Sequence, residues 1–388
     1  MIDEEDRRRI ATDLDASFVV EAAAGTGKTT ALIGRIVAIL ARGHARLDEI
    51  VALTFTTKAA GEMKLRLRGE LERARAAADG EERARLTAAL GALEAARIGT
   101  IHSFCQNMIF ERPVEAGIDP AAEIVEEEAT ERLVERALDP YFEACLEDPP
   151  EGIRRLLRRR GAPRRELVWA ARDLVEWRDH DALWRRPESF DREGELDELF
   201  EHLVGVAALA KLARDERDEL LGSLGKIARF VDDTRSRERA RPRDYGGMEA
   251  DRRALRKGWE WYRRGRGRFF APDVTREDAI IRRDEAAAAI DALLASADAE
   301  LAALLFRELR PVVDEYARIK ARAGKLDFLD LLLAARDLLR RQPAVLDELR
   351  ARYRRIFVDE FQDTDPVQAE ILAMLASDGP VGQIGRAS

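Results

Sequence analysis

The chain has 388 residues, 46% of them hydrophobic and 36% charged, which is enough to form more than one unit with a buried core. No stretch approaches the ~20 apolar residues of a membrane-spanning helix, which argues against a membrane protein. Two cysteines, Cys105 and Cys145, give no disulfide framework and predict a reducing, cytoplasmic location. The net charge of −9 is a weak guide to nucleic-acid binding, because such binding depends on where basic residues cluster.

A phosphate-binding loop is predicted after a short helix over residues 1–16. The run Phe18-Val19-Val20 predicts a buried strand, and apolar spacing after Thr29 predicts a helix. Small residues between them let backbone N–H groups surround an anion, toward which the helix directs its positive end. The predicted nucleotide-binding residues are Ala22, Ala23, Ala24, Gly25, Thr26, Gly27, Lys28, Thr29 and Thr30.

Within this loop, Lys28 is expected to reach the β- and γ-phosphates of a nucleotide, and the Thr29 hydroxyl to bind Mg²⁺. The strict loop pattern begins with Gly, where this chain has Ala22. The alternative interpretation is an ordinary glycine-containing turn between a strand and a helix.

Two more strands are predicted downstream. Residues 50–55 read as a buried strand followed by a helix, and residues 98–104 as a strand-like piece that continues into a helix. Between them, residues 68–97 predict an exposed helical hairpin with a break near Asp79 and Gly80. This alternation of strands and helices is typical of a parallel sheet covered by helices.

Strand signals nearly vanish between residues 111 and 310, which predicts a mostly helical inserted domain. Residues 232–256 are expected to be a disordered loop within it. Residues 259–270 mix aromatics with arginines and could bind single-stranded nucleic acid, although a helix with its aromatics in the core is the favoured interpretation. The predicted domains are the first part of an ATP-binding domain (1–110), the helical insertion (111–310) and the second part of the ATP-binding domain (311–388).

An acidic motif follows a fourth predicted strand near the C-terminus. The apolar run Ile356-Phe357-Val358 ends in Asp359 and Glu360, at the strand end where open α/β sheets bind ligands. Asp359 is expected to hold Mg²⁺, and Glu360 to orient or deprotonate the attacking water. Alternatively, the two acids begin a solvated helix. The loop and this motif together favour nucleotide hydrolysis.

Five segments, in order, resemble motifs of the UvrD/Rep-type superfamily-one DNA helicases, and most closely the RecB- and AddA-like subunits of helicase-nucleases. Residues 21–30 resemble motif I, in which Ala at the first position is usual, and residues 53–63 resemble motif Ia. Residues 99–105 resemble motif Ib, residues 326–331 the element before motif II, and residues 358–368 motif II.

The resemblance implies an α/β fold, a RecA-like P-loop parallel sheet interrupted by a large, mostly α-helical insertion. It implies ATP-dependent 3′-to-5′ DNA unwinding in repair and recombination, with ATP and Mg²⁺ as cofactors. Single- and double-stranded DNA and other helicase-nuclease subunits are the implied partners, without a membrane. The implied catalytic residues are Lys28, Glu360 and Gln362, the last sensing the γ-phosphate, and the implied metal ligands are Thr29 and Asp359.

The resemblance also implies a track for single-stranded DNA. Hydroxyls and lysine suit phosphate contacts, and aromatic or imidazole rings offer stacking faces. The implied DNA-binding residues are Thr54, Phe55, Thr56, Lys58, His102, Ser103 and Phe104.

Three features depart from the family pattern. Residues 1–16 lack the glutamine that reads adenine, the strand of motif III is altered after residue 376, and the motifs of a second motor domain are absent. We therefore expect a helicase fragment that holds ATP but hydrolyses it poorly, because such motors complete their site with arginines from the second domain. A non-catalytic DNA- or partner-binding module that has kept the ATP fold is the alternative. An unrelated P-loop kinase or GTPase is disfavoured, since these lack the Asp359-Glu360-x-Gln362-Asp363 run.

Overall fold

The computed structural model describes residues 2–21, 23, 26–145, 147–159, 163–179, 190–240, 242–257 and 269–377. Contacts divide the chain into two compact units: unit 1 comprises Met1–Glu126 and Ala321–Ser388, and unit 2 comprises Glu127–Lys320. Throughout the described ranges, no helix combines the length and apolar character needed to cross a membrane.

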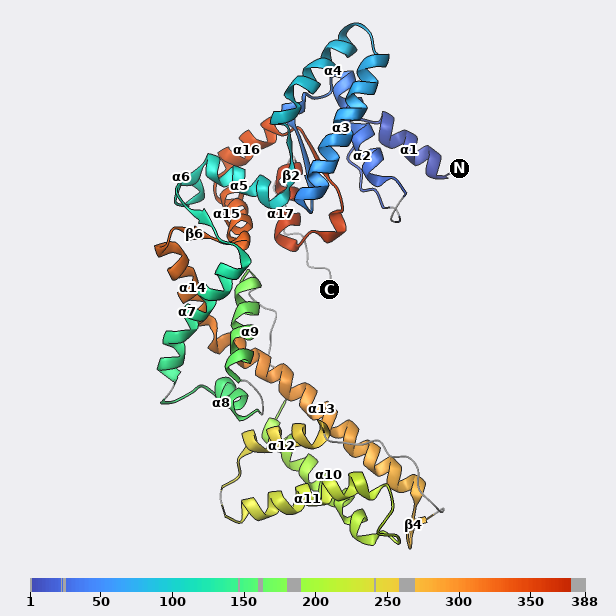
Figure 1. Cartoon of the computed structure of the whole chain (residues 1–388), viewed down its shortest axis with the longest axis vertical. Coiled ribbons are helices and arrows are strands. Elements are labelled where there is room, and N and C mark those ends of the chain that lie inside the picture. The colour runs from blue at the N-terminus through green and yellow to red at the C-terminus, as the bar shows by residue number, and fades with distance from the viewer. Residues whose placement is uncertain are drawn as a thin grey trace. The chain divides into compact units, whose positions relative to one another are not determined.

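Unit 1 is built on a parallel sheet of three strands, β1 (Ile50–Thr54), β2 (Arg97–Thr100) and β7 (Arg355–Val358). The strand order is β2-β1-β7, with β2 labelled in Figure 1, and the register places Leu53 beside both Gly99 and Val358. These strands fall where the sequence predicted them. A second parallel pair in unit 1 consists of β3 (Glu123–Ile124) and β6 (Lys325–Leu326). In the sequence, β3 lies shortly before unit 2 and β6 shortly after it.

Helices cover both faces of this sheet, because successive side chains of β1 point to opposite sides. Val51 and Leu53 belong to one hydrophobic core, and Ile50 and Ala52 to another. The first core is closed by α5 (Ile101–Glu111), α15 (Phe328–Arg341), α16 (Pro343–Arg352) and α17 (Pro366–Ala376), and the second by α2 (Lys28–Arg42), α3 (Thr57–Ala77) and α4 (Gly80–Ala92). Unit 1 is therefore an α/β structure with helices on both sides of a small parallel sheet.

The strand predicted at Phe18-Val19-Val20 does not form, and this prediction is wrong. The segment is irregular, with 93% of Val19 and 44% of Val20 exposed. A β-branched run becomes a strand only where a neighbour supplies hydrogen bonds and a face to bury. Within the described residues, no strand pairs with this segment. The flanking helices α1 (Ile2–Thr12) and α2 are present as expected.

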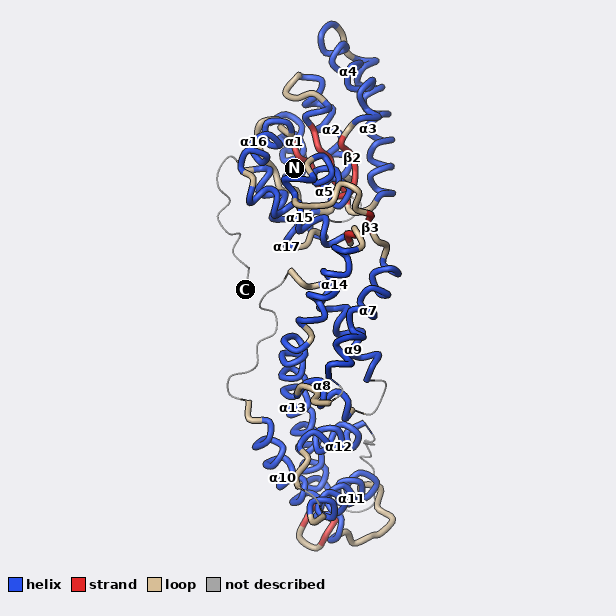
Figure 2. Tube along the Cα trace, turned by 90° about the vertical axis from the view of Figure 1, so that its left-hand side faces the viewer, coloured by secondary structure: helices blue, strands red, loops and turns tan. Residues whose placement is uncertain are grey.

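Unit 2 is almost entirely helical, apart from the short hairpin of β4 (Phe269–Ala271) and β5 (Val274–Thr275), seen in red at the foot of Figure 2. Residues 232–256 were expected to form a disordered loop, but the helices α11 (Leu221–Glu238) and α12 (Tyr245–Lys257) occupy most of this stretch, so that prediction is wrong. Of the aromatic- and arginine-rich stretch 259–270, residues 259–268 lie outside the described residues. The helices are α7 (Glu127–Cys145), α8 (Glu151–Arg158), α9 (Pro163–Glu176), α10 (Arg192–Leu212), α11 (Leu221–Glu238), α12 (Tyr245–Lys257), α13 (Arg276–Glu308) and α14 (Arg310–Arg322).

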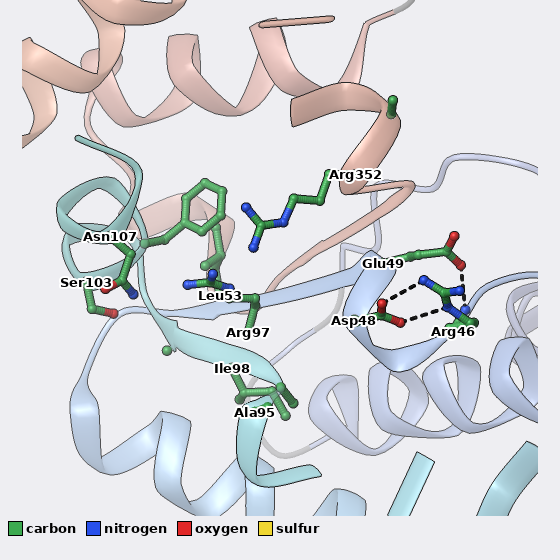
Figure 3. A pocket seen from close by; sticks show the side chains of 14 residues that line it. Arg46, Asp48, Glu49, Leu53, Ala95, Arg97, Ile98, Ser103, Asn107 and Arg352 are labelled. Carbon is green, nitrogen blue, oxygen red and sulfur yellow. Dashed lines mark hydrogen bonds and ion pairs between the residues drawn. The ribbon is translucent and has the colours of Figure 1, made fainter. Parts of the chain in front are cut away.

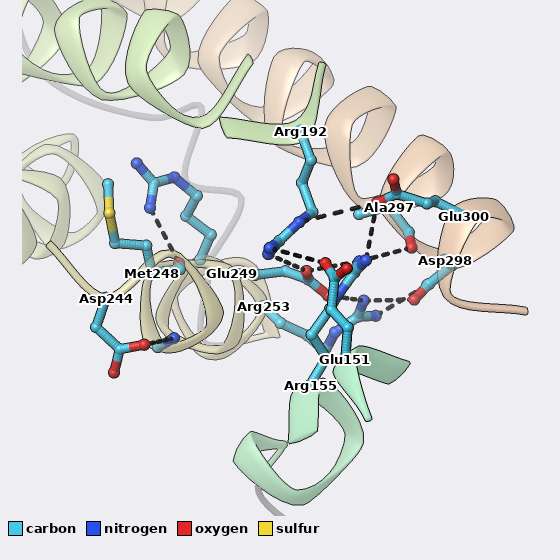
Figure 4. Close-up of polar contacts among 12 residues, drawn as sticks. Glu151, Arg155, Arg192, Asp244, Met248, Glu249, Arg253, Ala297, Asp298 and Glu300 are labelled. Atoms are coloured by element: carbon cyan, nitrogen blue, oxygen red, sulfur yellow. Dashed lines mark hydrogen bonds and ion pairs between the residues drawn. The ribbon is translucent and has the colours of Figure 1, made fainter. Parts of the chain in front are cut away.

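A buried ion-pair network links four helices of unit 2 (Figure 4). Arg155 on α8 contacts Glu249 on α12 at 2.9 Å and Glu300 on α13 at 2.8 Å. Arg192, at the start of α10, approaches the same two carboxylates at 3.4 and 3.8 Å. Because an unpaired charge in a protein interior is strongly destabilising, this network fixes how the four helices pack.

Candidate functional site

The predicted phosphate loop forms a turn, held by a hydrogen bond within it, before helix α2. The Thr26 hydroxyl donates to the carbonyl of Ala23 at 2.7 Å. Gly27 follows with φ = +92°, a left-handed conformation that glycine adopts without steric cost. Three of the predicted nucleotide-binding residues, Ala22, Ala24 and Gly25, lie outside the described residues.

Helix α2 begins directly after this turn, so Lys28, Thr29 and Thr30 form its first turn. The first N–H groups of a helix have no partner inside it and carry a partial positive charge. This end of α2 can therefore receive an anion, with the side chains of Lys28 and Thr29 beside it.

Asp359 lies at the carboxyl end of β7, where its N–H donates to the carbonyl of Leu53 at 2.9 Å. The Thr29 hydroxyl donates to Asp359 Oδ2, also at 2.9 Å. A hydroxyl and a carboxylate are the hard oxygen ligands that Mg²⁺ prefers, so the pair fits this ion. The described ranges hold no cluster of three or more His, Cys, Asp or Glu able to bind a metal.

Glu360, in the acidic motif, contacts Lys28 at the end of the predicted loop. Lys28 Nζ lies 3.4 Å from Glu360 Oε2, and Gln362 Nε2 donates a hydrogen bond to the same oxygen. The hydrogen bond from Gln362, followed by the contact with Lys28, lowers the pKa of Glu360. The carboxylate is thus ionised at neutral pH, and with 44% of its side chain exposed it is open to water.

The backbone of Glu360 is left-handed, with φ = 54°. Among the described residues other than glycine, Glu360 alone has a positive φ. For an L-residue this conformation costs about 1 kcal/mol. The turn leads into the short helix η3 (Phe361–Asp363) and brings the Gln362 amide back to the Glu360 carboxylate.

Three of the predicted DNA-binding residues are exposed just after β1. Phe55 is 55% exposed, and Lys58 is exposed on the first turn of α3. The Thr56 hydroxyl caps α3 by accepting the N–H of Ala59 at 3.1 Å. An open ring and an open ammonium at one strand end can contact a base and a phosphate.

Two more of the predicted DNA-binding residues, His102 and Ser103, are half-buried at the start of α5. The half-buried His102 ring meets the Phe328 ring edge to face, with centroids 5.7 Å apart. Burial lowers the pKa of His102, which keeps the imidazole neutral at pH 7. The Ser103 hydroxyl donates to the carbonyl of Thr100 at 2.8 Å. Phe328, 51% exposed, was not among the predicted DNA-binding residues, although residues 326–331 carried part of the family resemblance.

The other two predicted DNA-binding residues are buried. Thr54 is 2% exposed, and its hydroxyl donates to the carbonyl of Thr56 at 3.0 Å. Phe104 is 6% exposed and packs against Tyr353, with ring centroids 5.5 Å apart. These side chains support the exposed residues from within the core and are not accessible to DNA in this structure.

A cavity of about 550 Å³ in unit 1 lies between β2, α5 and the residues that precede β1 and β7 (Figure 3). It is lined by Ser103 and Phe104 but by none of the predicted nucleotide-binding residues. Its arginines Arg97 and Arg352 both contact the Glu111 carboxylate, at 2.6 and 2.9 Å. The single Glu111 carboxylate therefore pairs with both guanidinium groups.

Comparison with protein families matches residues 2–384 to the UvrD/REP helicase N-terminal domain. The chain belongs to the UvrD/REP helicase family. This membership confirms the resemblance drawn from the five motif-like segments. It also accounts for a phosphate loop and an acidic strand end meeting in one α/β unit.

Curated relatives carry helicase/nuclease names. The chain is 25% identical over 406 residues to an ATP-dependent helicase/nuclease subunit of Syntrophomonas wolfei, covering 96% of this chain and 32% of the relative. It is 25% identical over 391 residues to the protein of the same name from Alkaliphilus metalliredigens, covering 92% and 32%. Exonuclease/helicase subunit RexA of Lactococcus lactis is 25% identical over 427 residues, with 95% and 34% covered. The chain thus spans about a third of the length of these relatives.

Proposed function

We propose that this chain is the ATP-binding motor part of a DNA helicase that unwinds DNA in the 3′-to-5′ direction during repair and recombination. The observation that carries the proposal is the meeting of Thr29 with Asp359 and of Lys28 with Glu360, across more than 300 residues of sequence. A module that had lost catalysis would have no chemical need to keep all four side chains together.

In this proposal Lys28 neutralises the β- and γ-phosphates of ATP, while Thr29 and Asp359 hold Mg²⁺. The ion, when bound, supplies positive charge to the phosphates. Glu360 accepts the proton of the attacking water, and its ionised, water-accessible carboxylate supports this role. Gln362 reports the state of the γ-phosphate through its hydrogen bond to Glu360.

We further propose that unit 1 is a RecA-like domain and that the helical unit is inserted into it, as the domain prediction of 1–110, 111–310 and 311–388 describes. Support comes from the contact division at Glu126 and Lys320, and from the pairing of β3 with β6 on either side of the helical unit.

Single-stranded DNA is proposed to lie along exposed and half-buried residues that follow β1, β2 and β6. Phe55, His102 and Phe328 offer rings for stacking, and Lys58 offers a charge for phosphate. Because the relatives are named as subunits, other helicase-nuclease subunits are the proposed protein partners.

ATP turnover by the purified chain, with and without single-stranded DNA, tests the proposal beside a Lys28→Ala variant. We expect Mg²⁺-dependent nucleotide binding that Lys28→Ala weakens, with slow turnover. Turnover that DNA stimulates, and that Lys28→Ala abolishes, would show that the chain completes a catalytic site, contrary to the fragment hypothesis. If the wild-type chain binds no nucleotide, the proposal of an ATP-binding motor fails.

A further inference from the structure

Arg7, on helix α1, contacts the loop before α2. Its Nη2 donates a hydrogen bond to the carbonyl of Thr26 at 2.8 Å. Its Nη1 lies 3.9 Å from the position that a Cβ on Gly27 would take. The guanidinium therefore lies against the peptide bond between Thr26 and Gly27, directly before helix α2.

The position of α1 is itself fixed by a buried arginine of α2. Arg35 is 8% exposed and donates to the carbonyls of Ile10, Asp13 and Ala16 at 2.6, 2.7 and 2.6 Å. Its guanidinium also lies 4.8 Å from the centre of the Phe18 ring. These hydrogen bonds attach the end of α1 and the following segment to α2. They therefore fix the position of the helix that carries Arg7.

The geometry of a trans peptide gives this contact a consequence for anion binding. In a trans peptide the C=O and the N–H point in opposite directions. A charged donor that holds the Thr26 carbonyl therefore turns the Gly27 N–H toward the other side of the loop. Hydrogen bonds that involve a charged group are stronger than neutral ones, so this orientation is well held.

We propose that Arg7 is a positioning residue of the nucleotide site, orienting the Gly27 N–H to donate to a phosphate of a bound nucleoside di- or triphosphate. This inference rests on the proposed function, because it takes the loop as the phosphate site. Under this proposal, α1 contributes to binding of the phosphates of the nucleotide and not to binding of its base.

Two probes separate this role from its alternatives: ADP, and inorganic pyrophosphate, which has no base. We expect Arg7→Ala to weaken both about tenfold, because one oriented donor is lost. Arg7→Lys, which keeps a charged donor, should recover most of the affinity. The matched control is Arg8→Ala, since Arg8 lies on the same helix and its ion pair with Glu5, at 4.0 Å, is exposed.

The inference is overturned if Arg7→Ala binds both probes as the wild type does. It is also overturned if ADP binding falls while pyrophosphate binding does not, because Arg7 would then act on the base or ribose. Unfolding midpoints without ligand identify a variant that has lost its fold. Should Arg7→Ala be such a variant, Arg7→Met, which keeps a long side chain but has no hydrogen-bond donor, replaces it, with the same expected loss for both probes.

The Lys28→Ala variant distinguishes a failure of this inference from a failure of the proposed function. A wild-type chain that binds neither probe would contradict the proposed function itself. A wild-type chain whose binding is weakened by Lys28→Ala but not by Arg7→Ala would contradict only the role of Arg7.

Discussion

The Thr29 hydroxyl donates a hydrogen bond to Asp359 at 2.9 Å, joining the first turn of α2 to the carboxyl end of β7. If both oxygens bind Mg²⁺, Thr29→Val should remove most of the increase in ADP affinity that Mg²⁺ produces, because valine matches threonine in shape but has no hydroxyl. Thr29→Ser restores the oxygen and should restore the Mg²⁺ effect. Titrations of ADP with and without Mg²⁺ measure this, and an unchanged Mg²⁺ effect in Thr29→Val would contradict the assignment.

Glu360→Gln should bind ATP a few-fold more tightly than the wild type and turn it over more slowly. The substitution removes the negative charge that pairs with Lys28 at 3.4 Å, which leaves the ammonium available to phosphate, and it removes the proposed base. Equilibrium ATP binding and steady-state turnover measure the two effects. Asp363→Asn, which neutralises an exposed carboxylate three residues away, is the control. Equal turnover in Glu360→Gln and wild type would exclude Glu360 as the base.

Phe55→Ala should weaken binding of single-stranded DNA about tenfold, since a base stacked on an aromatic ring contributes about 1–3 kcal/mol. Leu65→Ala removes another exposed apolar side chain, 71% exposed on α3, and should have no effect. Fluorescence anisotropy of a labelled oligonucleotide at fixed salt gives both affinities. A similar loss in the two variants would mean that Phe55 makes no specific contact.

Arg155→Ala should lower the free energy of unfolding by about 3–5 kcal/mol, because it leaves the buried carboxylates of Glu249 and Glu300 without their main partner. Arg154→Ala changes the exposed neighbouring arginine and should have little effect. Urea denaturation of both variants measures the difference. If Arg155→Ala were as stable as Arg154→Ala, the network would not hold the helices of unit 2 together.

His102 should make the protein less stable in mild acid. Burial lowers its pKa in the folded state, so the unfolded chain takes up the proton more readily. Stability from this group is present above its unfolded pKa of about 6.5 and decreases as the pH falls below it. The difference in unfolding free energy between pH 7.5 and 5.5 should therefore be smaller in His102→Asn than in the wild type. An identical pH dependence would rule this effect out.

The sequence predicted elements whose local pattern and tertiary environment agree. The strands β1 and β7 each combine an apolar run with a following turn or helix start, and β2 (Arg97–Thr100) leads directly into a helix; each of the three has a neighbour to pair with. The run at Phe18-Val19-Val20 has the same local pattern but no neighbour among the described strands, so the pattern misleads there. Local propensity cannot report whether a partner strand is present.

Side-chain environment was harder to predict than element type. The polar segment 232–256 suggested a disordered loop, yet α12 is anchored by the pairing of Glu249 with Arg155 in a distant part of the sequence. Thr54 and Phe104 have suitable chemistry for DNA but face the core. Arg7 and Phe328 approach the site only through folding, Arg7 beside Thr26 and Phe328 beside His102, and no spacing in the sequence reports such contacts.

The left-handed backbone at Glu360 has a consequence for engineering this chain. Asn tolerates that conformation better than Glu, so Glu360→Asn should relieve part of the strain of about 1 kcal/mol while removing the proposed base. A library selected only for heat resistance would thus be drawn toward replacing the residue on which turnover is proposed to depend. Stabilised variants should therefore be screened for nucleotide turnover in the same round, so that variants that gain thermal stability by losing turnover are discarded.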